Sequence, residues 1–288
     1  MSDSPAPPPF ERIGPERPAS PVVLSVPHAG RDYSQQLLKA ARLPRAVLET
    51  LEDRLADRLV WRATEAGATA FVARVPRAEI DLNRDEREID PALIAPSPAP
   101  MDVLPSARTR GGIGLIPSRI TGVGAIWNAR ISRDELARRV EGVHRPYHRA
   151  LERALAAARE RFGAAVLLDC HSMPPRSGAS GQETVIFGDR YGTTTAPHLL
   201  DAAVAAARAL GYRTACNTPY AGGYICGRHG RPDRGIHAIQ IEIDRSIYLE
   251  PELRAPGPGF ADACRLIETV VAALEARLFG PAQALAAE

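Results

Sequence analysis

The chain has 288 residues, of which 45% are hydrophobic and 24% are charged. This composition is typical of one large or two small globular domains and excludes a largely disordered or fibrous protein. The 36 basic and 34 acidic residues give a formal net charge of +2. No overall charge therefore draws the chain to nucleic acid or to an anionic membrane.

The N-terminal segment and the cysteines indicate the compartment. Residues 1–20 are rich in proline and lack an apolar core, which predicts a disordered or extended arm rather than a secretory signal. No run of about 18 apolar residues occurs, so we expect no transmembrane helix. The wide spacing of the cysteines predicts reduced thiols in a cytoplasmic protein and argues against a zinc site made of cysteines alone. They are Cys170, Cys216, Cys226 and Cys264.

Apolar segments with strand-like and helix-like spacing alternate along the chain. In chain order we expect a strand over 21–27, a helix over 43–67, a strand over 68–75, loops over 91–105 and 111–124, a helix over 132–162, a strand over 164–169, a helix over 196–210, strands over 212–217 and 236–243, and a closing helix over 259–278. Ser132 and Glu135 form a capping box, and Pro146 predicts a break or kink in the helix that they begin.

This alternation predicts a doubly wound α/β sheet. We expect a single catalytic domain over residues 21–280, followed by a short tail over 281–288. Ligands of such sheets bind at the carboxyl ends of the strands, which is where the polar clusters of this sequence fall.

Three polar residues stand at or inside the apolar strands. His28 follows the first strand in SVPHAG, His171 follows another in LLDCHS, and Glu242 lies within the run IQIEID. Two histidines and a carboxylate converging on one sheet edge are the usual ligands of catalytic zinc. A single histidine after a strand is more often a packing residue, and Glu242 could instead form a buried ion pair with Arg245. Taken together, the three positions favour a metal site.

The spacing leaves the remaining metal ligand open. Asp53 and Asp57 lie one helical turn apart in EDRLADRL, and Asp32 follows His28 by four residues. Each is a candidate, although the first two could simply pair with neighbouring arginines on a solvated face. Asp169 is placed to act as an outer hydrogen-bond partner of His171.

Two further clusters are candidates for substrate binding. RAEIDLNR contains Arg77, Asn83 and Arg84, whose side chains can bind a carboxylate. The same residues are equally compatible with a surface turn of mixed charge. The glycine-rich segment 217–232 allows close approach to a ligand and contains Arg228, but it could also be an ordinary loop.

The motifs, in order, resemble those of the N-formylglutamate amidohydrolase family. They span roughly residues 22–250 and are SVPHAG, EDRLADRL, RAEIDLNR, the PYH of residues 146–148, DCHSMP, FGDRYG, TPYAGGYICGRHGRP and IQIEIDRSIYL. The family is similar in fold to the zinc carboxypeptidases and amino-acid deacylases. The resemblance therefore implies a three-layer α/β fold with a mixed sheet and helices on both faces.

The resemblance also implies an activity and a set of site residues. It implies hydrolysis of N-formyl-L-glutamate to formate and glutamate, with one Zn²⁺ or another divalent metal per chain and a place in histidine degradation. The implied ligands and catalytic base are His28, Asp53, His171 and Glu242, and the implied contacts of the substrate carboxylate are Asn83 and Arg84, with Arg77 as a second candidate. Carboxypeptidases have a glutamate three residues after the first histidine; Arg31 stands there in this chain. The carboxylate ligand must therefore come from elsewhere, and we assign Asp53.

Two other functions fit the same residues. One is a deacylase or carboxypeptidase-like amidase that acts on another N-acyl amino acid or a short peptide. The other is a binding protein on the same scaffold without turnover. In each enzymatic case we expect a small anionic substrate and neither nucleic acid nor membrane as a partner. The sequence does not give the oligomeric state.

Overall fold

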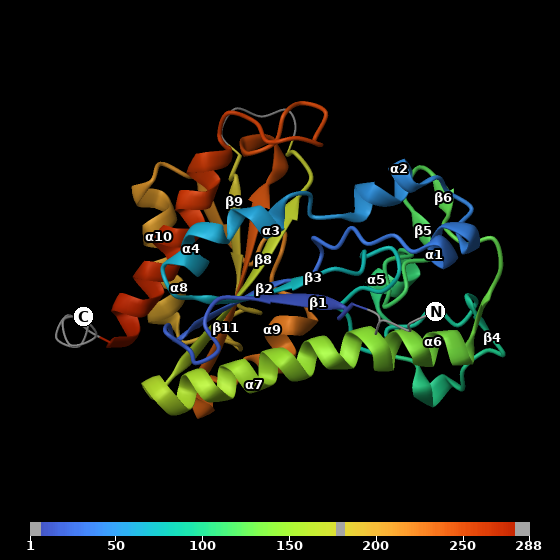
Figure 1. Ribbon diagram of the computed structural model, residues 1–288, viewed down its shortest axis with the longest axis horizontal. Helices are drawn as coiled ribbons and strands as arrows, with labels where there is room; N and C mark the ends of the chain where they lie inside the picture. The colour runs from blue at the N-terminus through green and yellow to red at the C-terminus, as the bar shows by residue number, and fades with distance from the viewer. Residues whose placement is uncertain (1–6, 177–181, 280–288) are drawn as a thin grey trace, which may run out of the picture. The chain divides into compact units, whose positions relative to one another are not determined.

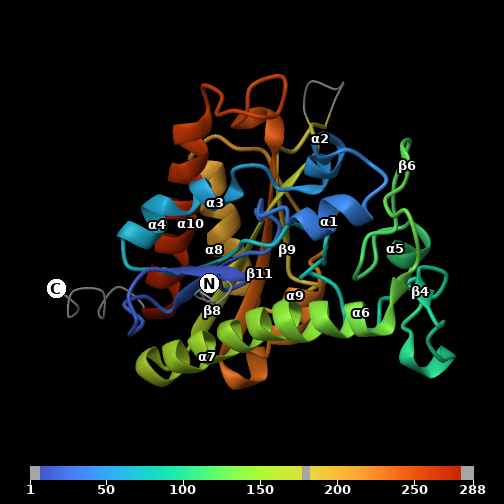
Figure 2. The same ribbon diagram turned by 45° about the vertical axis from the view of Figure 1, so that its right-hand side comes forward.

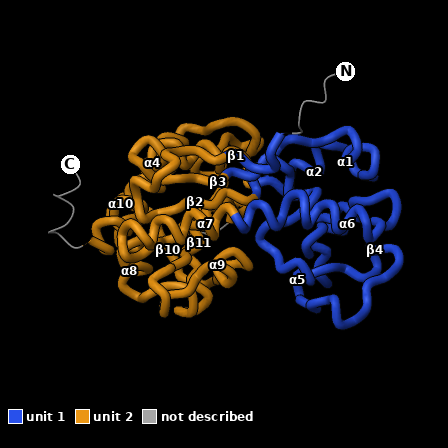
Figure 3. Tube along the Cα trace, turned by 60° about the horizontal axis from the view of Figure 1, so that its bottom comes forward, with its two compact units in different colours: residues 1–11, 28–52, 72–149 blue, residues 12–27, 53–71, 150–288 orange. Residues whose placement is uncertain are grey.

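The computed structural model describes residues 7–176 and 182–279. These fall into two compact units, coloured separately in Figure 3. Of the described residues, unit 1 comprises 7–11, 28–52 and 72–149, and unit 2 comprises 12–27, 53–71, 150–176 and 182–279. The expected single domain over 21–280 stays a prediction, and the expected tail over 281–288 lies outside the described residues. None of the described helices is long and apolar enough to cross a membrane.

A seven-stranded sheet carries the residues of interest, in the order β1-β3-β2-β8-β11-β9-β10. In that order the strands are Phe10–Ile13, Thr69–Ala73, Val22–Val26, Ala165–Met173, Ile236–Asp244, Val185–Gly188 and Thr214–Cys216. Strand β8 runs parallel to both β2 and β11, whereas β9 runs antiparallel to β11. The sheet is therefore mixed, as expected. Every residue of β8 is buried, which is typical of a central strand covered on both faces.

Helices cover both faces of the sheet in unit 2. On one face α10 packs against α3, α4 and α8, and on the other α9 packs against β8 and β11, with α7 beside it (Figures 1 and 2). The bounds are α3 Ala56–Leu59, α4 Trp61–Glu65, α7 Arg145–Phe162, α8 Pro197–Ala209, α9 Tyr224–His229 and α10 Phe260–Phe279. The three-layer α/β architecture is confirmed. Short 3₁₀ turns η4 and η5 lie on either side of β11, at Pro232–Arg234 and Arg245–Ile247.

Unit 1 consists mostly of short elements joined by loops. They are α1 Gln35–Ala40, α2 Arg45–Leu48, η1 Glu49–Leu51, β4 Ile94–Ala95, η2 Pro100–Asp102, α5 Ala107–Arg110, β5 Arg119–Ile120, β6 Gly124–Ala125, β7 Ile131–Ser132 and α6 Arg133–Arg139. Strand β4 pairs with β7, and β5 pairs with β6. The segments 91–105 and 111–124 thus contain only elements of two or three residues, in keeping with the expected loops.

The expected helix over 43–67 is wrong as a continuous element. The chain leaves the helical conformation between η1 and α3, where Leu55 has a φ of +60°. Asp53 lies in this break, and its carboxylate contacts β8. A regular helix would not deliver the carboxylate there, so the tertiary contact overrides the helical periodicity of the leucines. Gly67 ends the segment with a φ of +110°, which only glycine adopts readily.

The expected helix over 132–162 is confirmed, with one irregular turn. Ser132 caps α6 by accepting a hydrogen bond from the Glu135 amide. The expected break at Pro146 takes the form of a π turn, Val140–His144, between α6 and α7. In a regular helix the ring of Pro146 would clash with the carbonyl of residue 142. The wider π turn contains residue 142.

Candidate metal centre

Three buried side chains bring their ligand atoms together. One ligand atom each from His28, Asp53 and His171 lies within 4.8 Å of the others. His28 is the second residue after the end of β2, and His171 lies inside β8, which is longer than expected. Asp53 is the carboxylate in this group, whereas the alternative candidate Asp32 forms an exposed ion pair with Arg74.

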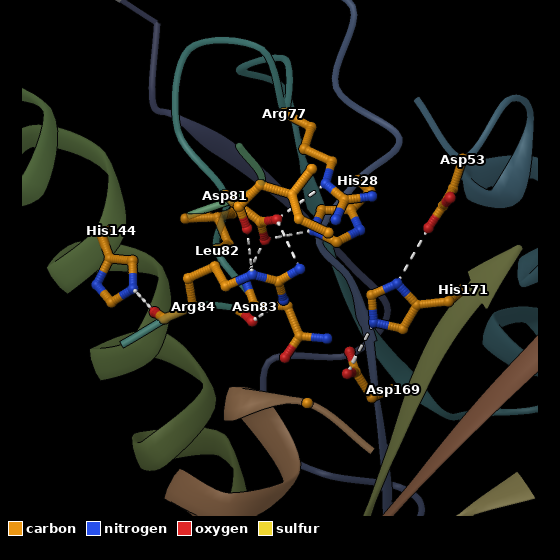
Figure 4. Close-up of polar contacts among 12 residues, drawn as sticks. His28, Asp53, Arg77, Asp81, Leu82, Asn83, Arg84, His144, Asp169 and His171 are labelled. Atoms are coloured by element: carbon orange, nitrogen blue, oxygen red, sulfur yellow. Dashed lines mark hydrogen bonds and ion pairs between the residues drawn. The ribbon is translucent and has the colours of Figure 1, made fainter. Parts of the chain in front are cut away.

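His171 lies between two carboxylates of unit 2 (Figure 4). Its Nδ1 is 3.0 Å from Asp53 Oδ2, and its Nε2 is 2.9 Å from Asp169 Oδ2. Asp169 also accepts a hydrogen bond of 2.8 Å from Ser25 Oγ on β2. Burial alone lowers the pKa of His171, but the two carboxylates raise it well above its usual value. The outer carboxylate fixes the imidazole orientation, as is usual for a metal-binding histidine.

Asp53 is held by two donors besides the imidazole. Arg245 Nη2 donates to Asp53 Oδ1 at 3.0 Å, and Ser172 Oγ donates to the same oxygen at 3.2 Å. Arg245 Nε in turn donates to Ser172 Oγ at 3.0 Å. The sequence suggested Arg245 as a possible ion-pair partner of Glu242. In the structure the Arg245 guanidinium donates to Asp53. The positive charge of Arg245 therefore lies directly beside the buried Asp53 carboxylate.

His28 has its own outer carboxylate in unit 1. Its Nε2 is 2.7 Å from Asp81 Oδ1, and Asp81 is fully buried (Figure 4). Arg77 Nε donates to Asp81 Oδ2 at 2.9 Å, and Arg84 lies 3.7 Å from the same oxygen. Although burial raises the pKa of Asp81, the two arginines and His28 hold it well below its usual range. Sequence reasoning missed this role of Asp81.

Glu242 is the buried carboxylate of β11. It pairs in register with His171 of the neighbouring β8 and is 8% exposed. Gln240 Nε2 donates to Glu242 Oε1 at 2.8 Å, while Gln240 Oε1 accepts from the Gly223 amide at 2.9 Å. The Gln240 amide thus orients Glu242 and ties it to the glycine-rich segment before α9.

The structure places the candidate substrate contacts in two settings. In unit 1, Arg77 has a side chain that is 20% exposed, whereas Arg84 is 4% exposed and donates to the carbonyls of Ile113 and Asn83. In unit 2, Arg228 lies on α9 and donates to the hydroxyl of Tyr224 at 3.0 Å. Their contacts with a substrate stay predictions.

Cys170 does not compete with His171 as a reactive group. It is the neighbouring residue in β8, so its side chain leaves the strand on the opposite face. Burial raises the pKa of its thiol well above the usual value, which keeps it protonated. All four cysteines are free thiols.

The donor set fits a divalent transition metal. Two imidazole nitrogens and one carboxylate oxygen are the protein ligands of many catalytic metal sites, which leave one position for water or substrate. Each histidine has an outer carboxylate on its other ring nitrogen. The buried group His28–Asp53–His171 could therefore bind such a metal.

The chain is similar to known proteins over most of its length. The family model described as N-formylglutamate amidohydrolase matches residues 20–249. The N-formylglutamate deformylases of Pseudomonas aeruginosa and Pseudomonas putida are 28% and 30% identical, over 87% and 80% of this chain and 90% and 82% of theirs. The crystal structure of N-formylglutamate amidohydrolase from Ralstonia eutropha JMP134 matches with a TM-score of 0.84 and 34% identity, over 91% of this chain and 95% of that one.

Proposed function

Because the chain belongs to the N-formylglutamate amidohydrolase family, we propose that it is a metal-dependent hydrolase that converts N-formyl-L-glutamate and water to formate and glutamate. One observation carries the metal dependence: the buried ligand atoms of His28, Asp53 and His171 lie within 4.8 Å of one another. The names of the relatives support the substrate.

Zinc is the metal that these ligands suit best, because neutral imidazole and carboxylate are its common partners in catalytic sites. A zinc ion bound there would polarise the formyl carbonyl and lower the pKa of a bound water to about 7. Other side chains of the protein hold these ligands in position. Asp169 and Asp81 each bond the other nitrogen of one imidazole, and Arg245 donates a hydrogen bond to the Asp53 carboxylate.

Glu242 is the proposed general base. It takes a proton from the attacking water, whose oxygen forms the new bond to the formyl carbon. The bond between this carbon and the amide nitrogen then breaks, and Glu242 returns the proton to the leaving amine. Its support is its place: it is the register partner of His171 on the adjacent strand, and Gln240 fixes its carboxylate.

The carboxylates of the substrate require cationic or hydrogen-bond-donating partners. We propose that the arginines Arg77, Arg84 and Arg228 and the amide of Asn83 fill this role. Arg77 has the strongest support, because its side chain is the most exposed of the three in unit 1. Arg84 has the weakest support, because it is buried and donates to two main-chain carbonyls. Through these two bonds Arg84 also holds the segment that carries Asp81.

A matched series of substrates and variants tests the proposal. We expect formate release from N-formyl-L-glutamate, with a much lower kcat/KM for N-formyl-L-leucine, which lacks the side-chain carboxylate. Glu242→Gln should remove turnover while zinc binding stays, and Glu268→Gln on the surface of α10 is the control. If N-formyl-L-leucine or N-acetyl-L-glutamate were the better substrate, the chain would be a deacylase of different specificity. Bound zinc without turnover of any N-acyl amino acid would favour a binding protein. The cytoplasmic location and the place in histidine degradation stay predictions.

A further inference from the structure

One face of the helical segment α6–α7 donates three side-chain N–H groups to a single stretch of main chain. Arg139 Nη1 donates to the Glu79 carbonyl at 2.9 Å. His144 Nε2 lies 2.9 Å from the Arg84 carbonyl, and His148 Nε2 lies 3.0 Å from the Leu82 carbonyl. Since a carbonyl oxygen only accepts, both imidazoles carry their proton on Nε2. Figure 4 shows the contact between His144 and Arg84.

The π turn places these three donors on the same side of the helical segment. Arg145 N–H bonds the carbonyl of Val140, five residues earlier, which defines a π turn. Arg139 and His144 are five residues apart across it, so the wider turn brings them to one side. His148 follows His144 by four residues in the regular α7, which keeps it on that side. In an uninterrupted α-helix, residues 139 and 144 would point in clearly different directions.

The stretch that receives these donors contains Asp81. Its main chain forms no helix or strand, so its carbonyls need other partners. Besides the three carbonyls already described, the Asn83 carbonyl accepts from the Arg84 side chain. The Asp81 amide donates to the Leu115 carbonyl at 2.7 Å. Side chains thus fix the position of the segment that presents Asp81 to His28.

Packing alone does not account for the two histidines. Tyr147, between them in the helix, is fully buried and packs edge-on against Phe10 with ring centroids 5.6 Å apart. His144 and His148 are also fully buried. A buried polar ring is costly unless its hydrogen bonds are made, whereas an apolar side chain would fill the same space. An apolar residue could replace the packing of His144 and His148, but it could not form their hydrogen bonds to the 79–84 main chain.

We infer that the π turn and its three donors, Arg139, His144 and His148, are positioning elements of the metal centre. They hold the 79–84 main chain so that Asp81 bonds His28 in a fixed orientation. The three donors contact the 79–84 main chain, and Asp81 of that stretch contacts His28. The inference rests on the proposed function only in taking His28 as a metal ligand.

Zinc affinity of His148 variants tests the inference, measured by competition with a chromophoric chelator. His148→Leu removes the donor to the Leu82 carbonyl, and we expect zinc to bind about 10-fold or more weakly, as for other losses of outer partners. His148→Gln should bind zinc within about threefold of the wild type, because its amide nitrogen reaches nearly as far as Nε2. Rescue by glutamine distinguishes the hydrogen bond from the shape of the ring.

Two controls separate positioning from a loss of stability. Gly142→Ala lies in the π turn at an exposed position where an added Cβ meets no atom within 4 Å, and it should keep wild-type zinc affinity. Leu151→Ala, at a fully buried position of the same helix, should lower the melting temperature without weakening zinc binding. If His148→Leu does not fold, Arg139→Met removes the donor to Glu79 and should weaken zinc binding in the same way.

The outcomes distinguish this inference from the proposed function. Wild-type zinc affinity in a folded His148→Leu or Arg139→Met variant would overturn the inference and leave the proposed function standing. Equal losses in His148→Gln and His148→Leu would overturn it too, because the hydrogen bond would not matter. A wild-type protein that binds no zinc would instead remove the metal dependence on which both rest.

Discussion

Glu242 and His171 lie directly opposite each other in the parallel pairing of β11 with β8. Register partners on adjacent parallel strands project from the same face of a sheet, so the proposed base and a proposed metal ligand are neighbours by backbone hydrogen bonding alone. Both strands are central in the sheet and buried. Their spacing therefore does not depend on a loop, which is how a precise site is built.

Asp169→Asn should weaken zinc binding while the protein stays folded. Asparagine can still accept the hydrogen bond from His171 Nε2, but it removes the negative charge that makes the imidazole a better ligand. We expect a loss of 10- to 100-fold in zinc affinity, measured by chelator competition. Asp201→Asn, on the exposed side of α8, should bind zinc like the wild type. Unchanged affinity in Asp169→Asn would show that the outer carboxylate does not tune the ligand.

Gln240→Leu should lower kcat more than it changes KM. The variant loses the hydrogen bond that orients Glu242 and leaves the Gly223 amide without its acceptor. We expect kcat to fall about 10-fold or more. A misplaced general base loses part of its roughly 10²- to 10⁴-fold contribution to the reaction rate. Steady-state kinetics with N-formyl-L-glutamate measures this. A higher KM at unchanged kcat would assign Gln240 to substrate binding instead.

Glu135→Gln should destabilise the protein at neutral pH and lose this effect in acid. The hydrogen bond from Arg138 lowers the pKa of Glu135 to about 2, against the opposing effect of burial, and Arg139 adds to it. A carboxylate with a depressed folded pKa stabilises above its unfolded value of 4.5, and this stabilisation disappears as the pH falls towards 2. We expect about 1 kcal/mol at pH 7, because the group is partly exposed to solvent.

Urea unfolding of both proteins between pH 2 and 7 measures the difference. Glu160→Gln, exposed on α7, is the control and should match the wild type across this range. A difference between Glu135→Gln and wild type that persists unchanged at pH 2 would contradict the assignment to the ionised carboxylate.

Cys170→Ala should keep formate release within about threefold of the wild type. The thiol is buried, and burial raises its pKa, so it supplies no nucleophile at neutral pH. The expected loss is in stability, about 1–2 kcal/mol for a small buried cavity. Loss of all turnover in a folded Cys170→Ala variant would instead indicate a thiol mechanism.

Candidate site residues that lie at or inside strands can be recognised from the sequence. His28, His171 and Glu242 are polar residues at or inside short apolar runs, and both the strands and the polar interruptions are visible without a structure. Asp53 was harder, because the leucines around it have helical spacing, whereas the chain breaks there and Leu55 takes a φ of +60°. Its assignment came from the family resemblance.

The outer partners could not be predicted in the same way. Asp81 bonds a histidine 53 positions away, and Arg245 bonds an aspartate 192 positions away. Pairings this distant depend on how the strands are ordered in the sheet, which local patterns do not encode. The π turn is also hidden, because one extra residue in a turn hardly changes the apolar spacing around it; Pro146 was its one visible sign.

Titration of metal-free protein with zinc, with formate release followed at each step, tests the central claim most directly. We predict that N-formyl-L-glutamate hydrolysis rises from near zero and stops rising at one zinc per chain. The break at one equivalent would tie the activity to the site of His28, Asp53 and His171. Full activity in metal-free protein, unaltered by added zinc, would contradict the account.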